Sequence, residues 1–586
     1  MERKALGKIL RDAVPAAFVA GMIVLLAFRW DFYYDLNDDV LIKDILSGIY
    51  TGVPAAHNIQ MLYPVSLLLS LLCRFFGGSG VYGIFLCLMQ FGALWLILRE
   101  GSRRIDNKTL RAQFTLFVMF FAFGVLASHL VFIQYTFTVS MMAGAAAVLL
   151  ILADNIGSGM KIGAWIICLI IWIAFGIRSE MLLLMMPLMG VAFFIRLLLD
   201  KGRLRAYIIW AIVLFAGMGL IYGADKLAYS GAEWSEFREL FDARTKLYDY
   251  EFIPSYEGNE DFYESIGLDA SEVELFHNYD YGLDDEIDAD VMRAVADHAQ
   301  LLKAKRPFKE RLAAAVKEYI YRLYSVSPRQ SHEYPQTDAP WNILVMVLYL
   351  GLIVISSPHI RGLLISLCLF GVRSALWLYI LYGERAPVRV VHGLFFMELC
   401  ILMAVIIREV SNAHSELMVI SIRAFSLVTA LATLISVIAI RGEAGLIDRD
   451  ISDRKDMSAA YDELWDYIDS DTDHFYWLDV YTSVAWQGIP YSEKIFGYRD
   501  NGISRHDLPG GWAFGSPVQR QKLENLSVKS PMESLTDGTA LLVMKKDGST
   551  DWLLSYYNSK GVEVQAHKEA LVGDSFVIYK IELRQQ

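Results

Sequence analysis

Cysteine is scarce in this sequence, and every cysteine lies in an apolar run. The 586 residues include five, which are Cys73, Cys87, Cys168, Cys368 and Cys400. The two stretches with the composition of soluble protein, 225–338 and 446–586, contain none. A disulfide framework and a cysteine-based zinc site are therefore excluded for both stretches.

Charged residues are also few. They make up 20% of the chain, whereas a soluble protein carries about a quarter. The deficit falls in 13–224 and 339–440, which are long, almost uncharged apolar runs. The remaining charges are mostly acidic, with 21 acidic and 5 basic residues between Asp225 and Gln300. Nucleic-acid binding needs a basic surface, so no nucleic acid is expected as a partner.

The apolar runs predict a polytopic membrane protein, because a helix needs roughly 20 apolar residues to cross about 30 Å of hydrocarbon. About eleven runs qualify by this measure. The predicted spans are 13–30, 80–98, 113–133, 135–153, 162–178, 181–198, 205–224, 339–356, 360–382, 391–408 and 418–440. A further run, 61–76, would form a helix of only about 24 Å.

Lysine and arginine orient the spans, because cytoplasmic loops are enriched in both. The basic leader before Ala13 predicts a cytoplasmic N-terminus. The apolar run that follows it lacks a small-residue cleavage site, so the first span is expected to be retained. The basic loops 99–111 and 196–205 both fall inside only if 61–76 lies along the outer membrane surface as a juxtamembrane helix. The segments then predicted to lie outside the plasma membrane are 31–79, 225–338 and 441–586.

The predicted fold class is an all-α polytopic membrane protein with a small extracytoplasmic α/β domain. Its predicted parts are a seven-span module at 1–224, an acidic outer region at 225–338, four further spans at 339–440 and the C-terminal domain at 441–586. The strands expected in that domain lie near Trp477–Val480, Thr539–Met544, Asp551–Tyr556 and Phe576–Ile581, and a helix is expected at Ser458–Tyr467. The basic stretch Lys303–Arg322 predicts a helix that rests on lipid headgroups or is solvated.

Polar side chains from four separated segments are predicted to meet at the outer membrane boundary. They are Asp35, Asp38, Asp39 and His57 in the first outer loop, His129 and Gln134 between the third and fourth spans, Arg178 and Glu180 in the next outer turn, and Glu384, Arg385, Arg389 and His392 between the ninth and tenth spans. A charge at membrane depth costs roughly 2.5–3.5 kcal/mol, so such groups usually face a cavity or a partner. Their gathering on one face predicts an active site there.

Each group also has a structural interpretation, which the sequence leaves open. The arginine and glutamate of the 178–180 turn could form the polar tip of a helical hairpin, and the arginines of 385–389 could anchor a helix to headgroup phosphates. The first-loop carboxylates could cap a helix that starts at Val40. His129 could be a packing residue.

The first outer loop resembles that of the C-type (GT-C) glycosyltransferases, which use polyprenyl-phosphate sugar donors. The acidic sequence WDFYYDLNDD at 30–39 is similar to the hallmark of that superclass, and SGIYTGVP at 47–54 is similar to the first loop of bacterial GtrII-type glucosyltransferases. The resemblance implies seven spans with juxtamembrane helices in the first loop, as in protein O-mannosyltransferases and oligosaccharyltransferases. The lysine-proline-proline motif of the aminoarabinose transferases of lipid A has no match here; Leu62-Tyr63-Pro64 stands near its place. The MIR-type insert of the O-mannosyltransferases also has no evident counterpart.

The resemblance implies transfer of a sugar from a polyprenyl-phosphate donor to a hydroxyl of a cell-surface glycan, lipid or protein. The leaving phosphate is already a stable anion, so one carboxylate suffices as base, whereas glycosidases need two. Asp38 or Asp39 is the predicted base, and the resemblance slightly favours Asp39. Because adjacent helical residues point about 100° apart, only one should reach the acceptor. The other would orient the acceptor or hold a divalent cation such as Mg²⁺ or Mn²⁺; the sequence leaves cation use open.

Arginine binds phosphate through bidentate hydrogen bonds, which assigns Arg385 and Arg389 to the donor phosphate. Arg178, held by Glu180, is a predicted second contact with phosphate or acceptor. The remaining predicted substrate contacts are His57, which could also be a metal ligand, His129 and Gln134. In the C-terminal domain, Trp486 and the loop Pro509–Trp512 could stack on sugars or simply pack, and the resemblance implies acceptor recognition for this domain.

Two other function classes stay open. A lipid or polysaccharide transporter would show paired halves and charges at mid-membrane, and the sequence shows no internal repeat. A non-enzymatic surface assembly protein would bind a partner through its outer domains, and its charges at the membrane boundary would then be incidental.

Overall fold

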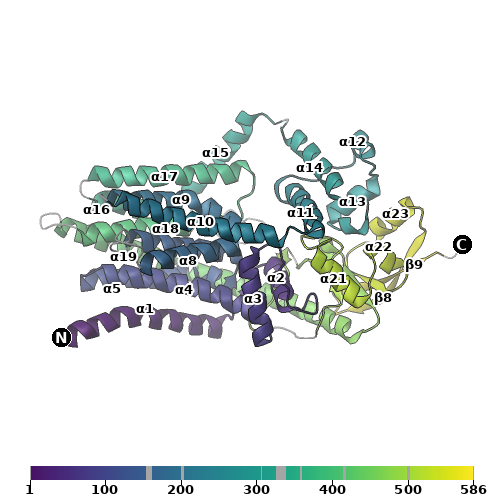
Figure 1. Ribbon diagram of the computed structural model, residues 1–586, viewed down its shortest axis with the longest axis horizontal. Coiled ribbons are helices and arrows are strands. Elements are labelled where there is room, and N and C mark those ends of the chain that lie inside the picture. Colours follow the sequence, from purple (N-terminus) through teal and green to yellow (C-terminus); the bar gives the residue numbers. More distant parts are fainter. Residues whose placement is uncertain are drawn as a thin grey trace.

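The computed structural model describes residues 2–78, 80–152, 162–199, 203–304, 306–324, 338–356, 359–412, 418–486, 488–497 and 502–584. Long helices run side by side in a bundle, and a body of short helices and strands lies at one end of it (Figure 1). We call this the domain end of the bundle. The N-terminus lies at the opposite end (Figure 1).

The bundle is built from long, mostly apolar helices. They are α1 (Glu2–Arg29), α4 (Gly80–Arg104), α5 (Lys108–Gly124), α7 (Tyr135–Leu152), α8 (Ile162–Ile177), α9 (Ser179–Leu199), α10 (Leu204–Ala228), α16 (Ala339–Ile355), α17 (His359–Tyr382), α18 (Val388–Ser411) and α19 (Met418–Ser470). Of the described helices, 7 are long and apolar enough to cross a membrane. Helix α8, helix α16 and the apolar part of α1 are also apolar but shorter. The prediction of a multi-pass helical membrane protein is confirmed. Residues 200–202 of the predicted basic loop 196–205 lie outside the described residues.

The predicted span 113–133 is wrong at its end. Helix α5 ends at Gly124, and the short helix α6 (Ala127–Val131) and strand β2 (Phe132–Ile133) follow. At Gly124 the carbonyl oxygen of Ser436 on α19 approaches so closely that a Cβ atom would lie 2.0 Å from it. Helix α19 thus packs directly on the end of α5, and the helix ends there although the apolar run continues in the sequence.

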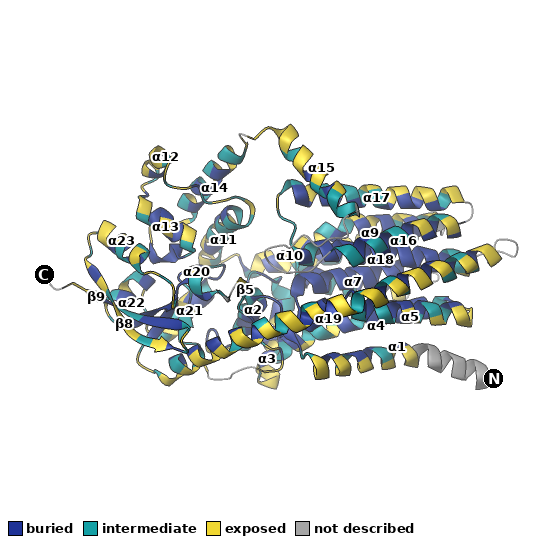
Figure 2. Ribbon diagram, turned by 180° about the vertical axis from the view of Figure 1, so that it is seen from behind, coloured by how far each residue is buried: buried dark blue, intermediate teal, exposed yellow. Residues whose placement is uncertain are grey.

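Helices α7 and α18 form the centre of the bundle, where almost all their residues are buried (Figure 2). Small residues allow this close packing. A Cβ atom at Gly144 would lie 2.8 Å from the ring of Phe396, and one at Gly393 would lie 2.3 Å from the hydroxyl of Ser140. The N-termini of α7, at Tyr135, and α18, at Val388, are thereby held together.

The first loop carries two helices, α2 (Asn37–Ser47) and α3 (Tyr63–Phe76). Helix α3 runs across the direction of the bundle helices, as expected for 61–76 (Figure 1). Its exposed face carries Leu68, Leu71 and Phe75, which suits a helix lying in a membrane interface. Before α2, strand β1 (Tyr33–Tyr34) pairs in parallel with β2, so the first loop is fixed to the start of α7.

The outer region after α10 consists mainly of helices. They are α11 (Ala232–Thr245), the π-helix η1 (Lys246–Tyr250), α12 (Glu260–Ser265), α13 (Ala270–Asn278), the 3-10 helix η2 (Tyr281–Leu283), α14 (Ala289–Ala304) and α15 (Phe308–Tyr324). Helix α15, which covers most of the predicted stretch Lys303–Arg322, packs on α17. The hydroxyls of Tyr319 and Ser374 lie 2.7 Å apart there.

The C-terminal domain is a small α/β domain, as predicted. Its elements are β3 (Phe475–Leu478), α20 (Val480–Ser483), β4 (Ala485–Trp486), β5 (Ile489–Pro490), β6 (His506–Asp507), α21 (Pro517–Leu526), α22 (Pro531–Thr536), β7 (Ala540–Lys545), α23 (Asp551–Ser559), β8 (Val564–Val572) and β9 (Phe576–Leu583). The main sheet has the order β6-β3-β7-β9-β8, with β3 parallel to β6 and β7 and the remaining pairs antiparallel.

One predicted strand of this domain is wrong. The segment Asp551–Tyr556 forms the start of helix α23, whose buried residues are Leu553, Tyr556 and Tyr557. Their spacing of three and four residues is that of one helix face. Bulky apolar residues such as these are typical of a strand, but their burial follows the period of a helix.

The outer region and the C-terminal domain share one hydrophobic core. Phe276 and Met292 of the outer region lie in the same cluster as Trp477 and Leu542 of the sheet. Helix α19 joins this body to the bundle, because the predicted span 418–440 and the predicted helix Ser458–Tyr467 are parts of one helix of 53 residues. The domain is therefore continuous with the membrane helices.

Candidate functional site

The first loop is anchored by a buried arginine of α19. Arg454 is fully buried, and its guanidinium donates to the backbone carbonyls of Tyr34 at 3.1 Å and Asp35 at 3.2 Å. The Asp35 carboxylate lies 3.5 Å from the same guanidinium. Asp35, one of the predicted outer carboxylates, therefore holds the loop that leads into α2.

Helix α2 carries the other two carboxylates in its first turn. Leu36 is the N-cap residue and has no side-chain cap, while Asp38 and Asp39 lie inside the turn. The unpaired backbone N–H groups of a first turn favour negative charge nearby. The two side chains nevertheless have different surroundings, because Asp39 is buried and Asp38 is partly exposed.

Asp39 is completely buried. Its Oδ1 atom accepts a hydrogen bond of 2.7 Å from the Tyr82 hydroxyl of α4, and Oδ2 has no hydrogen-bond partner among the described residues. Burial raises the pKa of the Asp39 carboxyl well above its usual value, and the hydrogen bond from Tyr82 does not offset this. The protonated form of Asp39 is favoured.

Asp38 is partly exposed and faces the C-terminal domain and α7. The indole Nε1 of Trp512 donates a hydrogen bond of 3.1 Å to its Oδ1 atom. The charges of Asp38, Asp39, Arg178 and Arg389 all act on the hydroxyl of Tyr135, the first residue of α7. The structure thus brings both predicted first-loop carboxylates together with two of the predicted arginines.

Arg178 lies between α8 and α9 with its guanidinium over the Tyr135 ring, 5.3 Å from the ring centroid. It donates to the side-chain oxygen of Gln60 at 2.5 Å and lies 3.2 Å from the Glu180 carboxylate. Glu180 is mostly exposed. The guanidinium also interacts with the charges of Asp38 and Asp249.

Arg385 lies at the edge of this cluster. Its guanidinium is 3.2 Å from the Asp249 carboxylate of η1 and 5.4 Å from the centroid of the Tyr250 ring. Arg389 lies in the first turn of α18. Asp249 links Arg385 to Arg178, because its charge acts on both.

His57 lies apart from the cluster, in a box of aromatic rings. It stacks on Trp234 with a centroid distance of 4.9 Å, and the rings of Tyr63 and Tyr229 lie at 4.7 and 5.0 Å. Burial lowers the pKa of His57, which favours the neutral ring. These contacts fasten the first loop to α10 and α11.

His129 and Gln134 make packing and capping contacts. The Nε2 atom of His129 lies 2.8 Å from Nδ1 of His392, and its ring stacks on Phe137. The Gln134 side chain accepts from the backbone N–H of Phe137 at 3.0 Å and donates to Thr136 at 3.1 Å. Both residues thus support the start of α7, beneath Tyr135.

Three residues of the cluster were not singled out by the sequence. They are Gln60, Tyr135 and Asp249. Trp512 was expected only to stack on sugars or to pack, as part of the loop Pro509–Trp512. Gln60 and Tyr135 adjoin apolar runs and could have been found as polar groups at span ends. Asp249 is one of many acidic residues in its region, and nothing in the sequence distinguishes it.

A buried ion pair inside the bundle also escaped sequence analysis. Arg373 of α17 lies 3.1 Å from Glu398 of α18, and Tyr349 of α16 donates to the same carboxylate at 2.5 Å. All three side chains are buried. Each charge stands alone in an apolar run, which was the available signal. Charged groups therefore lie inside the bundle as well as at its domain end.

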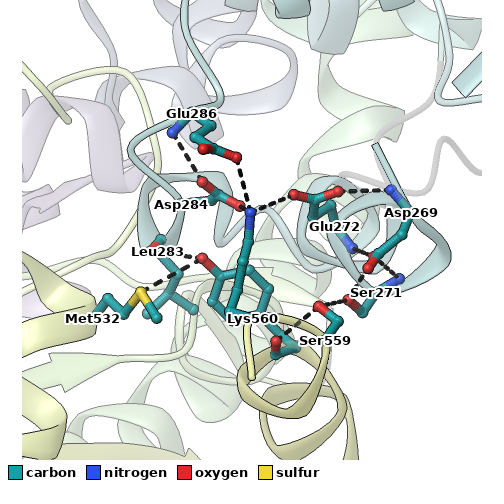
Figure 3. A network of polar contacts seen from close by, with 10 residues as sticks. Asp269, Ser271, Glu272, Leu283, Asp284, Glu286, Met532, Ser559 and Lys560 are labelled. Atoms are coloured by element: carbon teal, nitrogen blue, oxygen red, sulfur yellow. Dashed lines mark hydrogen bonds and ion pairs between the residues drawn. The ribbon is translucent and has the colours of Figure 1, made fainter. Parts of the chain in front are cut away.

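The C-terminal domain and the outer region are joined by a polar network around Lys560 (Figure 3). The ammonium lies 2.7 Å from Glu272, 3.0 Å from Asp284 and 3.0 Å from Glu286. These carboxylates are the group of three among the described residues whose geometry could hold a metal ion. Lys560 already supplies the positive charge at their centre, so the network is an ion-pair lock between the two parts.

Two cavities lie near the cluster without containing it. One, of about 640 Å³, opens between α11 and α21 and is lined by Glu236, Asp288, Phe514 and Arg520 among others. The other, of about 140 Å³, lies beside α2 and is lined by Lys43, Trp465 and Glu493 among others.

No protein-family model matches the chain, and no curated protein matches it. Among solved structures, the chain is similar to ArnT from Cupriavidus metallidurans in the apo state, with 11% sequence identity and a TM-score of 0.41 over 98% of each chain. It is also similar to the structure of that protein bound to undecaprenyl phosphate, with 11% identity and a TM-score of 0.38 over 96% of this chain and 97% of the other. A likeness of this degree assigns no role to any residue here.

Proposed function

We propose that this protein transfers a sugar from a polyprenyl-phosphate donor to an acceptor hydroxyl at the extracytoplasmic face of the plasma membrane. One observation carries the proposal. At the domain end of the bundle, the Arg178 guanidinium lies 5.3 Å from the centroid of the Tyr135 ring, and both of these side chains interact with the charge of Asp38. We take Asp38 as the base, and Arg178 and Arg389 as the phosphate-binding pair.

The domain end is proposed to be the extracytoplasmic end. The basic turn between α4 and α5, with Arg103, Arg104 and Lys108, lies at the other end of the bundle together with the N-terminus (Figure 1). Basic loops favour the cytoplasmic side. Nucleotide sugars are absent outside the cell, so a transferase working there needs a lipid-linked donor that reaches it through the membrane.

The site is suited to a phosphate. Helices α7, α9 and α18 begin at Tyr135, Ser179 and Val388, beside the two arginines. A helix N-terminus presents unpaired N–H groups and partial positive charge to an anion. Arginine adds bidentate hydrogen bonds to phosphate oxygens. Arg178 and Arg389 are therefore proposed to bind the donor phosphate, and Arg385 to contact it from the edge once Asp249 releases it.

Asp38 is the proposed base. Asp39 is completely buried, which raises the pKa of its carboxyl, and its Oδ1 atom already accepts a hydrogen bond from Tyr82. Asp38 is partly exposed and makes one hydrogen bond, to Trp512. This assignment differs from the slight preference for Asp39 that the first-loop resemblance gave, because burial was not visible in the sequence.

In the proposed step, Asp38 removes the proton of the acceptor hydroxyl while the oxygen of that hydroxyl attacks the anomeric carbon. A carbon–oxygen bond forms to the acceptor, and the bond between the anomeric carbon and the phosphate oxygen breaks. The polyprenyl phosphate leaves with the electron pair, and the arginines balance its charge. Asp39 and Tyr82 support the first turn of α2 without taking part.

The test compares surface glycopolymers by mass spectrometry in a strain that lacks the gene and in strains complemented with variants. We expect the deletion to lose one sugar substituent, the unaltered protein to restore it, and Asp38→Asn to lose the roughly 10²–10⁴-fold contribution of a positioned base.

The matched control is Asp31→Asn, a first-loop carboxylate whose partner is Lys494 at 3.1 Å. It should restore the substituent. Restoration by Asp38→Asn at equal protein level would refute the role of Asp38 and the proposed function with it.

A further inference from the structure

We propose that Trp512 of the C-terminal domain is a positioning residue for Asp38, so that this domain completes the catalytic site instead of only recognising the acceptor. The inference rests on the proposed function of Asp38 as base. It starts from a contact between residues 474 positions apart, in which the indole Nε1 donates to Asp38 Oδ1 at 3.1 Å.

Trp512 belongs to the hydrophobic core of the helix bundle. Its side chain is 9% exposed, and Ala513 and Val518 belong to the same core. Trp477, another tryptophan of the domain, shows the ordinary arrangement. It lies in the domain's own core and donates to the Ser534 hydroxyl at 2.9 Å.

The loop that carries Trp512 is held by the outer region. The backbone N–H of Gly282 donates to the Pro509 carbonyl at 2.8 Å, and the Tyr281 hydroxyl donates to the Gly511 carbonyl at 2.6 Å. A Cβ atom at Gly510 would lie 1.8 Å from the Tyr279 carbonyl oxygen, so only glycine fits there. The loop is thus fixed against a neighbouring backbone on the side away from α2.

The C-terminal domain is also fixed to the far end of α2 and the turn after it. Asp507 accepts a hydrogen bond of 2.7 Å from the Tyr50 hydroxyl, and Asn525 donates to the Thr51 carbonyl at 2.9 Å. Contacts at both ends of α2 leave little freedom between this helix and Trp512. The hydrogen bond to Asp38 is therefore built into the docking of the domain.

The chemical consequence is a fixed orientation of the base. With Oδ1 engaged by the indole, the Asp38 side chain keeps one rotamer and presents Oδ2 to the acceptor hydroxyl. Trp512 thus keeps Asp38 aimed, as a third group orients the base in other catalytic sites.

The test measures kcat and KM for sugar transfer by the purified full-length protein in lipid nanodiscs. The donors are synthetic undecaprenyl-phosphate monosaccharides, and the acceptor is the glycopolymer isolated from the deletion strain. In Trp512→Phe we expect kcat to fall about 10-fold or more, toward the loss of general-base catalysis. The KM for the donor should stay nearly unchanged, because a misplaced base weakens the transition state and not the binding of the donor.

Two further variants separate positioning from packing. Trp512→His keeps a ring N–H donor and should recover part of the activity that Trp512→Phe loses. Trp477→Phe removes an indole hydrogen bond elsewhere in the same domain and should lower the melting temperature without lowering kcat. Melting curves of all variants show which of them are folded.

Asp38→Asn distinguishes the two levels of failure. If it is inactive while Trp512→Phe has the unaltered kcat, or while Trp512→His gains nothing over Trp512→Phe, the positioning role is wrong and the proposed function stands. If Asp38→Asn transfers sugar at the unaltered rate, the proposed function is wrong and the inference falls with it.

Discussion

Asparagine in place of Asp39 changes the buried carboxyl of α2 and leaves its neighbour Asp38 in place. The amide oxygen can still accept the 2.7 Å hydrogen bond from Tyr82. We expect transfer activity to stay within about threefold of the unaltered protein, against the 10²–10⁴-fold contribution of a positioned general base. The same substitution at Asp38 should remove that contribution.

The stability change of Asp39→Asn follows from the contacts of the two oxygens. Oδ1 keeps its donor, so a hydrogen bond worth about 1 kcal/mol net is preserved. Oδ2 has no partner among the described residues, so an amide N–H there is as poorly satisfied as the acid O–H it replaces. By contrast, Asp39→Leu leaves the buried Tyr82 hydroxyl without an acceptor, at a cost of about 1–3 kcal/mol.

The pH dependence of this variant has a defined sign. The folded-state pKa of Asp39 is raised by burial, so its contribution to stability is fully present below the unfolded pKa of about 3.9 and is lost as pH rises through the folded value. Asparagine does not titrate. The melting temperature of Asp39→Asn relative to the unaltered protein should therefore rise between pH 4 and pH 8.

The assay is sugar transfer in nanodiscs together with melting curves across that pH range. A folded Asp39→Asn protein that loses 100-fold or more in kcat would refute the reasoning, because the buried residue would then be the base. If the melting temperature of Asp39→Asn minus that of the unaltered protein falls as the pH rises, Asp39 is ionised in the folded state.

Two further predictions concern ion pairs away from the site. Lys560→Met leaves Glu272 and Asp284 without their counter-ion, and we expect a loss of about 1–3 kcal/mol in the free energy of unfolding by urea, below the 3–5 for fully buried pairs because Lys560 is 24% exposed. Burial lowers the pKa of Lys560, but its carboxylate hydrogen bonds raise it on balance, so the unaltered protein should lose this stabilisation only above about pH 10.4, and the variant should lack that transition. Arg373→Met leaves Glu398 unpaired in the bundle and should lower stability in detergent by about 3–5 kcal/mol, whereas the double variant Arg373→Met/Glu398→Met should recover most of it. A double variant no more stable than the single one would contradict this.

The membrane helices could be predicted from the sequence because the bilayer imposes a length and a composition on each span. The juxtamembrane position of 61–76 followed from the placement of basic loops alone. The end of the third span could not be predicted, since α5 ends at Gly124, where α19 packs on it, and apolar residues continue past that point. A contact between two distant segments leaves no local signal.

The sequence predicted a set of candidate residues but not their arrangement. The sequence placed Asp38, Asp39 and Arg178 at one boundary, and the structure brings them together. It could not separate the two aspartates, because their difference depends on Tyr82 and Trp512, which lie 43 and 474 residues away from their partners. Burial of a single side chain is a property of the tertiary structure.

Helix α19 gives the molecule a mechanical property. It has 53 residues, so it is about 80 Å long, and roughly 45 Å of it extends beyond its predicted membrane span. A rotation of about 10° at the membrane would carry its distant tip roughly 8 Å sideways. Arg454 lies on this helix and donates hydrogen bonds to the backbone carbonyls of Tyr34 and Asp35. A tilt of α19 is therefore transmitted to the segment that leads into α2.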